Sequence, residues 1–392
     1  MIKLNGRFKL LSGNPLDSYV TPLTKNMTLP LVLANKVGLI LEEDIDSPQG
    51  YKFILRKKPS VNSKLSKEIE YLVSTDLQHL DEGDVVRVEG QDSNVRVLYR
   101  RKSNQNSILI TEQCNHYCLM CSQPPKDIDD GYIIDEVFDL IKLIPQDTLE
   151  IGFTGGEPTL FGDKFLDLIN LTKSYLPNTS LHILSNGRSF QDIKFARDYA
   201  KIDHPDVMIG IPIYSDDPVM HDYIVQAKNA YNETIRGILN LKSLNQKVEI
   251  RVVIHKLNAF QLSSIADFIV RNLQFVDHVA LMGLEIIGFT RANLDLLWVD
   301  QIEYKDELSK ATQILRNYGM NVSIYNHQLC LVNEDVKFAY RKSISDWKNE
   351  YVPECGKCLK KEECGGFFTS SALYKYSSNL KPFRNNIEED CI

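Results

Sequence analysis

The chain has 392 residues, 43% of them hydrophobic and 25% charged, with a formal net charge of −7. This length predicts one large domain with one or two smaller ones, and the acidic balance argues against general nucleic-acid binding, which needs basic surfaces. No apolar run reaches the roughly 18 residues of a membrane span, and the N-terminal MIKLNGRFKLLSGNP lacks the apolar core of a signal peptide. We therefore expect a cytoplasmic protein with no membrane partner.

The cysteines fall into two separate groups. Thiols stay reduced in the cytoplasm, where cysteines are more often metal ligands or catalytic groups than disulfides. None of the eight lies in the first hundred residues, three lie within 114–121, and five follow residue 329. Each group is therefore a candidate metal site.

Residues 1–103 predict a small β-rich domain. The runs VGLIL and YKFIL and the stretch DVVRVEGQDSNVRVLYRR are rich in Val, Ile and Leu between turn-forming residues. The last stretch predicts a hairpin through EGQDSN. The basic clusters LRKKPS and LYRRKSN are interpreted as solvated faces, with docking patches as the less favoured alternative.

Residues 104–319 predict the large domain, because short apolar runs alternate there with amphipathic stretches of helical period. Six consecutive β/α units imply parallel strands with right-handed connections. The expected fold class is α/β, a partial (β/α)6 TIM-like barrel, since eight units would close a full one. The strands are expected at 107–111, 148–154, 180–186, 206–213, 248–255 and 277–284, and the helices at 132–144, 162–175, 189–201, 218–245, 260–273 and 301–318.

The first cysteine group lies directly after the first of these strands, in TEQCNHYCLMCSQPPK, with Cys114, Cys118 and Cys121. In β/α barrels the loops after the strands form the active face. A structural zinc site would need a fourth ligand, and a [4Fe–4S] cluster is normally held by four thiolates. Three thiolates leave one iron without a protein ligand, and an open coordination site is typical of a catalytic metal.

Polar residues also follow the second and third strands. FTGGEP contains Gly155 and Gly156, whose backbone can approach a ligand closely, and Glu157, whose carboxylate can pair with an ammonium group. A plain turn with a helix-start Glu is the alternative. LSNGR supplies Asn186, for which ordinary Asn-Gly turn chemistry is an equal alternative.

The loops after the fourth to sixth strands add further candidates on the same face. They lie in IPIYSDDPVMHD, VVIHKLN and LMGLEIIGFTR, and they are Ser215, Asp217, His221, Asp222, His255, Asn258, Glu285 and the flexible Gly288. Asp217, His221 and Asp222 can instead cap the following helix. A lone His such as His255 is more often structural than catalytic, and a substrate role for Glu285 is only a guess from its position.

Residues 320–392 have a weaker pattern and predict a small cysteine-rich domain that a metal must stabilise. Cys355, Cys358 and Cys364 lie in PECGKCLKKEECGGFF, with Cys330 before them and Cys391 near the end. One structural zinc ion is the simple interpretation of this set.

The spacing CxxxCxxC resembles that of the radical S-adenosylmethionine (radical SAM) superfamily, from about residue 105 to the end of the sixth strand. The resemblance implies that the open iron binds the amino and carboxylate groups of S-adenosylmethionine, and that one electron releases a 5′-deoxyadenosyl radical, which abstracts a substrate hydrogen. It gives no catalytic side chain. The cofactor contacts that it implies are Gly155, Gly156 and Glu157 with the methionine amine, Ser215 with the ribose, Asn186 and Asn258 nearby, and the backbone of Met120, where the family usually has an aromatic residue, with the adenine.

The whole loop with its SQPP, and the region ISDWKNEYVPECGKC, resemble the His-Xaa-Ser system radical SAM maturases, C-type component. The C-terminal cysteines resemble a reduced SPASM or twitch domain, which implies an auxiliary [4Fe–4S] cluster on Cys330, Cys355, Cys358 and Cys364, with Cys391 left over. The implied substrate is a ribosomally made peptide. A flavodoxin- or ferredoxin-type electron donor and a partner maturase are the further partners expected.

Two other functions remain open. The same radical chemistry can act on a nucleoside, an RNA or a small metabolite, although the acidic charge of −7 speaks against RNA. The chain can also be a non-enzymatic zinc protein that uses both cysteine groups for stability or partner binding. Iron and sulfide in the purified protein would exclude the zinc protein.

Overall fold

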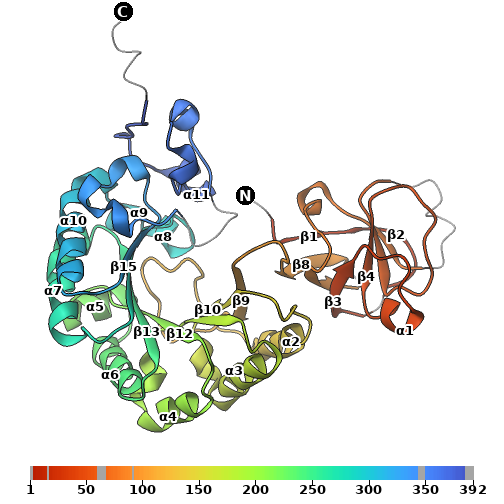
Figure 1. Cartoon of the computed structure of the whole chain (residues 1–392), viewed down its shortest axis with the longest axis horizontal. Helices are drawn as coiled ribbons and strands as arrows, with labels where there is room; N and C mark the ends of the chain where they lie inside the picture. Colours follow the sequence, from red (N-terminus) through yellow and green to blue (C-terminus); the bar gives the residue numbers. More distant parts are fainter. Residues whose placement is uncertain (1–2, 16, 60–67, 91, 343–348, 385–392) are drawn as a thin grey trace, which may run out of the picture.

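The computed structural model describes residues 3–15, 17–59, 68–90, 92–342 and 349–384. A β-rich N-terminal domain lies at one end of an elongated molecule, and a curved parallel sheet surrounded by helices lies at the other (Figure 1). Within the described ranges, no helix combines the length and hydropathy needed to cross a bilayer.

The N-terminal domain is an eight-stranded mixed sheet in the order β1-β8-β7-β3-β4-β5-β6-β2. Only Phe8 separates β1 from β2, so the two ends of the sheet are held by one continuous segment and the sheet curls towards closure. Phe8 and Phe53 both pack on the ring of Tyr71 inside it. The elements are β1 Asn5–Arg7, β2 Lys9–Ser12, β3 Tyr19–Thr24, α1 Leu31–Ala34, β4 Gly38–Leu41, β5 Phe53–Arg56, β6 Glu70–Leu72, β7 Val85–Glu89 and β8 Asn94–Tyr99.

The basic cluster LRKKPS is not simply a solvated face, because its arginine is buried. Arg56 is 2% exposed, and its Nε donates to Glu70 Oε2 at 2.7 Å. Its Nη1 donates to the carbonyl of Ile45, and its Nη2 donates to Ser47 Oγ. A buried charge is tolerated when it is paired and hydrogen-bonded in this way. The expectation therefore failed at Arg56, where tertiary pairing replaces solvent.

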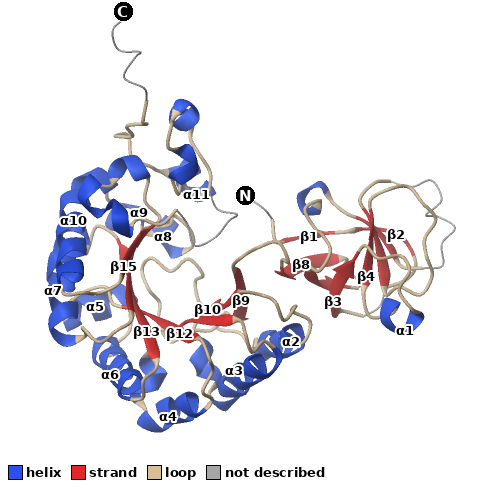
Figure 2. Cartoon of the chain, in the orientation of Figure 1, coloured by secondary structure: helices blue, strands red, loops and turns tan. Residues whose placement is uncertain are grey.

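The large domain is a curved sheet of parallel strands in the order β15-β14-β13-β12-β11-β10-β9, with helices on its outer face (Figures 1 and 2). The α/β class with a nearly closed, barrel-like parallel sheet is thereby confirmed. The strands are β9 Asn106–Thr111, β10 Glu150–Gly155, β11 Ser180–Leu184, β12 Val207–Pro212, β13 Lys247–Ile254, β14 His278–Gly283 and β15 Val322–Tyr325. The helices are α2 Gly131–Ile141, α3 Asp163–Tyr175, α4 Ile193–Lys201, α5 Pro218–Val225, α6 Ala230–Ser243, α7 Leu262–Asn272, α8 Phe289–Ala292, α9 Leu294–Leu297, α10 Gln301–Asn317 and α11 Thr369–Tyr374.

Two details of this domain differ from the sequence prediction. The sheet has a seventh strand, because β15 pairs in parallel with β14, whereas the sequence predicted six strands. The helix expected at 218–245 is two helices, α5 and α6. Gln226 and Asn229 adopt left-handed backbone conformations with φ of 53° and 61°, and these conformations end one helix before the next begins.

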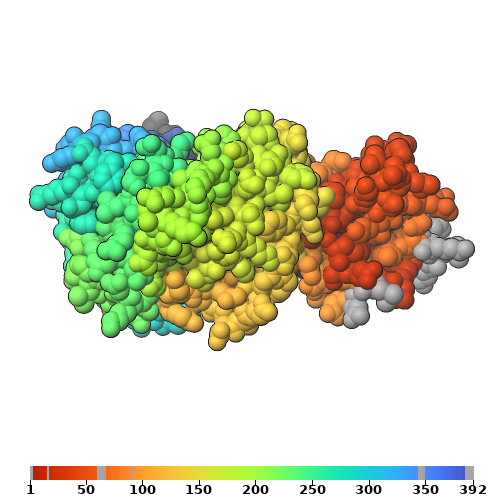
Figure 3. Space-filling view, turned by 90° about the horizontal axis from the view of Figure 1, so that it is seen from below, coloured from red at the N-terminus to blue at the C-terminus, as the bar shows by residue number. Residues whose placement is uncertain are grey.

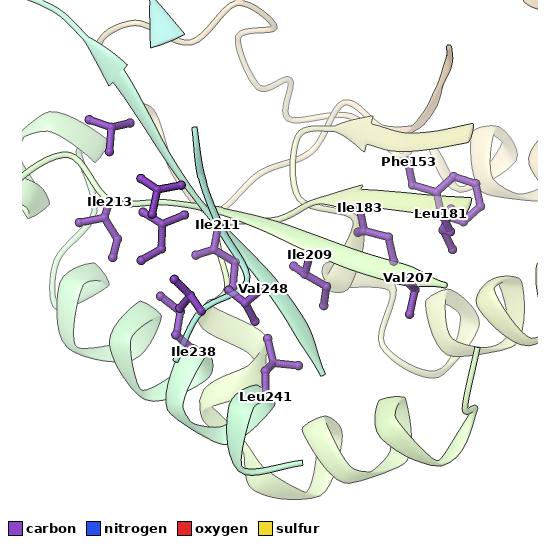
Figure 4. Close-up of a cluster of buried hydrophobic side chains, with 14 of the residues drawn as sticks. Phe153, Leu181, Ile183, Val207, Ile209, Ile211, Ile213, Ile238, Leu241 and Val248 are labelled. Atoms are coloured by element: carbon purple, nitrogen blue, oxygen red, sulfur yellow. The ribbon is translucent and has the colours of Figure 1, made fainter. Parts of the chain in front are cut away.

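The barrel strands alternate between an apolar outer face and a polar inner face. Outward side chains such as Phe153, Ile183, Ile209 and Val248 pack against the helices, where Ile238 of α6 meets them (Figure 4). The inner face carries polar residues instead, namely Glu150, His182, Glu249, Arg251, His278, Ser323 and Tyr325. A parallel sheet covered on both faces would show continuous apolar runs, so the alternation identifies an inner face that borders open space.

The N-terminal domain is packed firmly on the first β/α unit of the barrel (Figure 3). The carboxylate of Glu136 on α2 accepts hydrogen bonds from Arg87 and Arg96. The hydroxyls of Tyr99 and Thr148 are hydrogen-bonded at 2.7 Å, and the Tyr99 ring belongs to the barrel core. Buried ion pairs and a shared core make this junction part of the fold rather than a free linker.

Candidate active site

The first cysteine group lies at the carboxyl edge of the barrel sheet, in the loop directly after β9. The thiols of Cys114, Cys118 and Cys121 are close enough to influence one another. Burial and the neighbouring thiols hold the pKa of Cys118 far above its usual range, and burial with the carboxylate of Glu157 raises the pKa of Cys114 to about 12. Thiols in such surroundings need a positive partner before they ionise, and a bound metal centre supplies one.

The loop is held by backbone hydrogen bonds from both sides. On one side it pairs with the end of α5, and on the other it is fixed by residues of α8 and the turn after it. The bonds are Tyr117 N to Val225 O at 3.0 Å, Leu119 N to Ile224 O at 2.9 Å, Phe289 N to Cys121 O at 2.9 Å, Thr290 Oγ1 to Met120 O at 3.1 Å and Asn293 Nδ2 to Leu119 O at 2.9 Å.

Gly288 belongs to this anchoring rather than to a flexible substrate loop. A Cβ added to it would lie 2.3 Å from Cys121 O, and its φ is 58°. The side chain of Met120 is 6% exposed and packs in an apolar cluster with Tyr214 and Leu297. The loop is therefore fixed before any cofactor binds.

The two glycines of FTGGEP are required by close contact with the cysteine loop. Gly156 N donates to Thr111 O and Glu157 N donates to Gln113 O, both at 2.8 Å. A Cβ on Gly155 would lie 2.3 Å from Thr111 O, and a Cβ on Gly156 would lie 1.9 Å from Gln113 O. The segment thus continues the strand pairing up to the residue before the first cysteine, and only glycine fits there.

The side chain of Glu157 does not face an open site. It is fully buried, and burial raises its pKa. Its carboxylate accepts hydrogen bonds from Thr159 N at 3.1 Å, Ser185 Oγ at 2.8 Å and Asn186 N at 2.6 Å. In this structure the carboxylate joins the second and third loops, and its pairing with an ammonium group stays a prediction.

Asn186 connects the third loop to the first. Its Nδ2 donates to Asn115 Oδ1 at 2.6 Å, inside the cysteine loop. Its Oδ1 accepts from Arg188 N at 3.0 Å, and Arg188 Nη1 donates to Asn115 O at 3.2 Å. The structure thus brings three of the predicted loops together around the thiols.

Ser215 and Asn258 lie in the same region but are engaged internally. Ser215 Oγ is fully buried and accepts from Asp217 N, while Asp217 caps α5. Asn258 Nδ2 donates to the carbonyls of Tyr214 and Val253, and its Oδ1 accepts from His255 N at 2.9 Å. In the structure both residues hold the backbone of the loops after β12 and β13.

Three histidines in the segments after β9, β12 and β13 are buried, which their sequence positions did not indicate. Among the described residues, neither ring nitrogen of His255 has a hydrogen-bond partner, and burial lowers its pKa to about 3. His116 and His221 are also buried, with pKa values lowered to about 3 and about 4, mainly by burial. All three imidazoles are therefore neutral at ordinary pH and add no positive charge to the surroundings of the thiols.

The second cysteine group forms a pocket of its own. Cys330, Cys355, Cys358 and Cys364 all line one pocket with about 360 Å³ of empty volume. Burial and the other three thiols raise the pKa of Cys355. Backbone N–H groups point at Cys364 Sγ, from Leu329 at 3.3 Å and Gly366 at 3.4 Å. Cys391 and residues 344–348 of the region ISDWKNEYVPECGKC lie outside the described residues.

Neither group is shaped around a single ion. Within the described ranges, no set of three or more His, Cys, Asp or Glu side chains converges tightly enough to hold a metal ion directly. Zinc draws its thiolates to about 2.3 Å, whereas a cubane cluster is a larger body and its ligands stand farther apart. Three thiols in the first group and four in the second fit the donor sets of iron–sulfur clusters in number and chemistry, and zinc on the second group is the alternative that metal analysis decides.

Comparison with known proteins bears on the first cysteine group. Residues 108–269 match the family model of the radical SAM superfamily. Relatives by sequence include GTP 3′,8-cyclases. The one from Campylobacter jejuni subsp. doylei is 26% identical over 300 residues, covering 72% of this chain and 84% of that protein. The one from Campylobacter jejuni strain RM1221 is 26% identical over 47% of this chain and only 60% of its own length.

Solved structures with a similar fold include peptide-bound and cofactor-bound proteins. SuiB from Streptococcus suis bound to its precursor peptide SuiA has a TM-score of 0.46 and 14% identity, over 60% of this chain and half of that chain. Native anSMEcpe with bound AdoMet has a TM-score of 0.43 and 15% identity, over 56% of this chain and 63% of that chain. The similarity in each case covers part of the molecule.

Proposed function

We propose that this protein is a radical SAM enzyme that cleaves S-adenosylmethionine at a [4Fe–4S] cluster held by Cys114, Cys118 and Cys121, and the match of residues 108–269 to the superfamily model supports the proposal. When bound, this cluster and its cosubstrate supply a 5′-deoxyadenosyl radical, which takes a hydrogen atom from the substrate. The observation that carries the proposal is the loop with three neighbouring thiols at the carboxyl edge of the sheet.

The chain's own residues hold and shield this site. The loop is fixed through α5 and α8, so three ligands are positioned without a fourth. The extended GGE segment places its backbone beside Cys114. Its N–H groups at Gly156 and Glu157 are engaged with the cysteine loop, so its C=O groups are the contacts that it can offer to the amine of the cosubstrate. Met120, Asn186, Ser215 and Asn258 shape the surrounding loops, and their contribution is to keep the site rigid and dry.

We also propose an auxiliary [4Fe–4S] cluster on Cys330, Cys355, Cys358 and Cys364. Four thiols around one pocket supply a complete ligand set. The backbone N–H groups aimed at Cys364 Sγ would stabilise the negative charge of a ligating thiolate. A closed set of four ligands suits electron transfer or structural support rather than direct cosubstrate binding.

The proposed substrate is a ribosomally made peptide, as the resemblance of the cysteine loop and the C-terminal cysteines to peptide maturases suggests. A flavodoxin- or ferredoxin-type donor would supply the electron, and a partner maturase belongs to the same proposal. A second candidate is a nucleotide substrate, which the 26% identity to GTP 3′,8-cyclases favours. The second cysteine group does not distinguish a peptide substrate from a nucleotide substrate, and the assays below do.

Two measurements test the proposal in sequence. The anaerobically reconstituted and reduced protein should form 5′-deoxyadenosine from S-adenosylmethionine, and a protein that forms none is not a radical SAM enzyme of this mechanism. Coexpression with small peptides encoded nearby should then give a peptide of altered mass, with deuterium transferred from labelled peptide into 5′-deoxyadenosine. Turnover of GTP with no change in any peptide would select the nucleotide alternative.

A further inference from the structure

A wide cavity occupies the inside of the curved barrel sheet, with about 1650 Å³ of empty space that opens to solvent. It begins at the amino ends of the strands, near Glu150 and His278, and its wall is the polar inner face described above. It extends along β10 to Thr154, the residue before Gly155. On β10 and β11 the cavity lining thus reaches Thr154 and Leu184, close to the carboxyl ends of these strands.

Arg251 lies in the middle of this wall, in a slot that the neighbouring strand leaves open. A Cβ added to Gly210 of β12 would lie 2.8 Å from Arg251 Cδ and 3.1 Å from His182 Nε2. The missing side chain of Gly210 thus makes the space in which the guanidinium stem and the imidazole ring lie. A larger residue here would displace both side chains.

The guanidinium of Arg251 has one strong hydrogen-bond acceptor and one weak one. Its Nη1 donates to Glu249 Oε1 at 2.6 Å. Its Nη2 lies 3.1 Å from Met282 Sδ, and a thioether is only a weak hydrogen-bond acceptor. An oxygen anion in the cavity would be a much stronger partner for that edge of the fork.

Glu249 is itself held in place, so it orients the guanidinium of Arg251. Its Oε2 is 2.7 Å from His278 Nδ1, and His278 Nε2 is 3.0 Å from Ser323 Oγ. Burial alone would raise the pKa of Glu249, but hydrogen bonds from His182 and His278 and the charge of Arg251 hold it well below the usual range. The carboxylate is thus ionised and already paired.

Three further charged groups line the cavity, namely Asp277, Arg341 and Glu150. Asp277 accepts from Lys242 Nζ at 2.7 Å and is neutralised there. Arg341 adds a second guanidinium, whose Nη1 donates to the carbonyls of Phe338 and Tyr340. Glu150 is the opposing charge, and burial raises its pKa, which weakens its opposition. The charged and titratable lining groups are Glu150, His182, Glu249, Arg251, Asp277, His278, Tyr325 and Arg341.

We propose that this cavity binds an oxyanion of the substrate, a carboxylate or a phosphate, against the guanidinium of Arg251. Arginine presents a planar fork of donors that matches both groups, and a partly buried wall strengthens the attraction. The inference rests on the proposed function, because it assigns the anchoring group of that enzyme's substrate. A ligand held at Arg251 can extend past Thr154 towards the cysteine loop.

Binding to the full-length reconstituted protein, measured by calorimetry without reductant, tests this site with two probes. GTP represents a phosphate source, and an N-acetylated, glutamate-containing tripeptide amide represents a carboxylate source. At least one probe should bind, R251Q should weaken its binding about tenfold or more, and E150Q should strengthen it by removing an opposing charge. R236Q, at an exposed arginine of α6, should bind like wild type.

Each result of these binding measurements either supports or overturns the proposed oxyanion site at Arg251. The proposal is overturned if neither probe binds, and also if a probe binds but R251Q does not weaken its binding. If R251Q loses its cooperative melting transition, R251K replaces it, because lysine keeps the charge but loses the two-pronged geometry and should still bind more weakly. The probe that binds identifies the source of the oxyanion. If the wild-type protein binds neither probe but still forms 5′-deoxyadenosine, this site alone is refuted, whereas a wild-type protein that forms no 5′-deoxyadenosine refutes the proposed function itself.

Discussion

The two cysteine groups of this chain differ in how many ligands they offer and in how they are held. The first offers three thiols on a loop fixed from two sides by backbone hydrogen bonds to α5 and α8. The second offers four thiols around one pocket, supported by short turns and by N–H groups aimed at sulfur. The contrast teaches that an open site needs rigidity from the protein, because no fourth ligand helps to close it, whereas a complete set can contribute its own stability.

The largest expected effect breaks the first group alone. C118A should abolish 5′-deoxyadenosine formation, because two thiols cannot position the cluster with one open iron. The auxiliary site shares no residue with this loop, so the iron content should fall from about eight to about four per chain. Iron and sulfide analysis with a chromatographic assay for 5′-deoxyadenosine measures both. Turnover above background in C118A would disprove the ligand assignment.

The matching substitution in the second cysteine group, C358A, should give the opposite pattern. Loss of one ligand from the complete set should remove the auxiliary cluster, while S-adenosylmethionine is still cleaved to 5′-deoxyadenosine in the first site. The modified product should decrease even though cleavage continues. The same iron and product assays apply, and a protein that keeps about eight irons would show that Cys358 is not a ligand.

A third substitution tests how closely the GGE segment must approach the cysteine loop. In G156A the new methyl group would lie 1.9 Å from Gln113 O, so the backbone must move and the unfolding free energy should fall by roughly 1–3 kcal/mol or more. Cofactor cleavage should fall with it. G131A is the matched control, because its Cβ would meet only Asp129 Oδ1, at 3.5 Å. Denaturant unfolding compares the two variants, and equal stability would contradict the contact.

The smallest effect concerns one anchoring bond. T290V keeps the shape of a fully buried side chain but removes the hydroxyl that donates to Met120 O at 3.1 Å. The unfolding free energy should fall by about 1–2 kcal/mol because a buried carbonyl loses its partner. The first cluster should be lost faster on chelator treatment, and the second should not. Equal loss from both sites would show that this bond has no particular role in the loop.

Much of the site was predictable because the chemistry is local in sequence. The spacing of Cys114, Cys118 and Cys121 and their place after a β run were sufficient to predict their loop. The strand positions followed from apolar runs, since Phe153 and Ile183 pack on the helices. The contacts that could not be predicted depend on partners distant in sequence. Arg56 is buried because Glu70 reaches it, and the carboxylate of Glu157 is occupied because Asn186 and Ser185 donate to it.

The polar inner face was visible in the sequence but was not recognised. In VEIRVVI the charged residues Glu249 and Arg251 alternate with Val248 and Ile250, which is the period of a strand with one open face. If this segment is interpreted only as a buried apolar strand, its two charged residues do not indicate a cavity. The strand Val322–Tyr325 was missed as part of the sheet because four residues give too short a pattern to separate it from the C-terminal region.

The central claim is that the first cysteine group leaves one iron open for S-adenosylmethionine. Electron paramagnetic resonance of the reduced C358A protein, which keeps only the first cluster, tests it most directly. Addition of S-adenosylmethionine should change the spectrum of that cluster, because the cosubstrate becomes a ligand of the open iron. A spectrum that S-adenosylmethionine leaves unchanged would contradict the account.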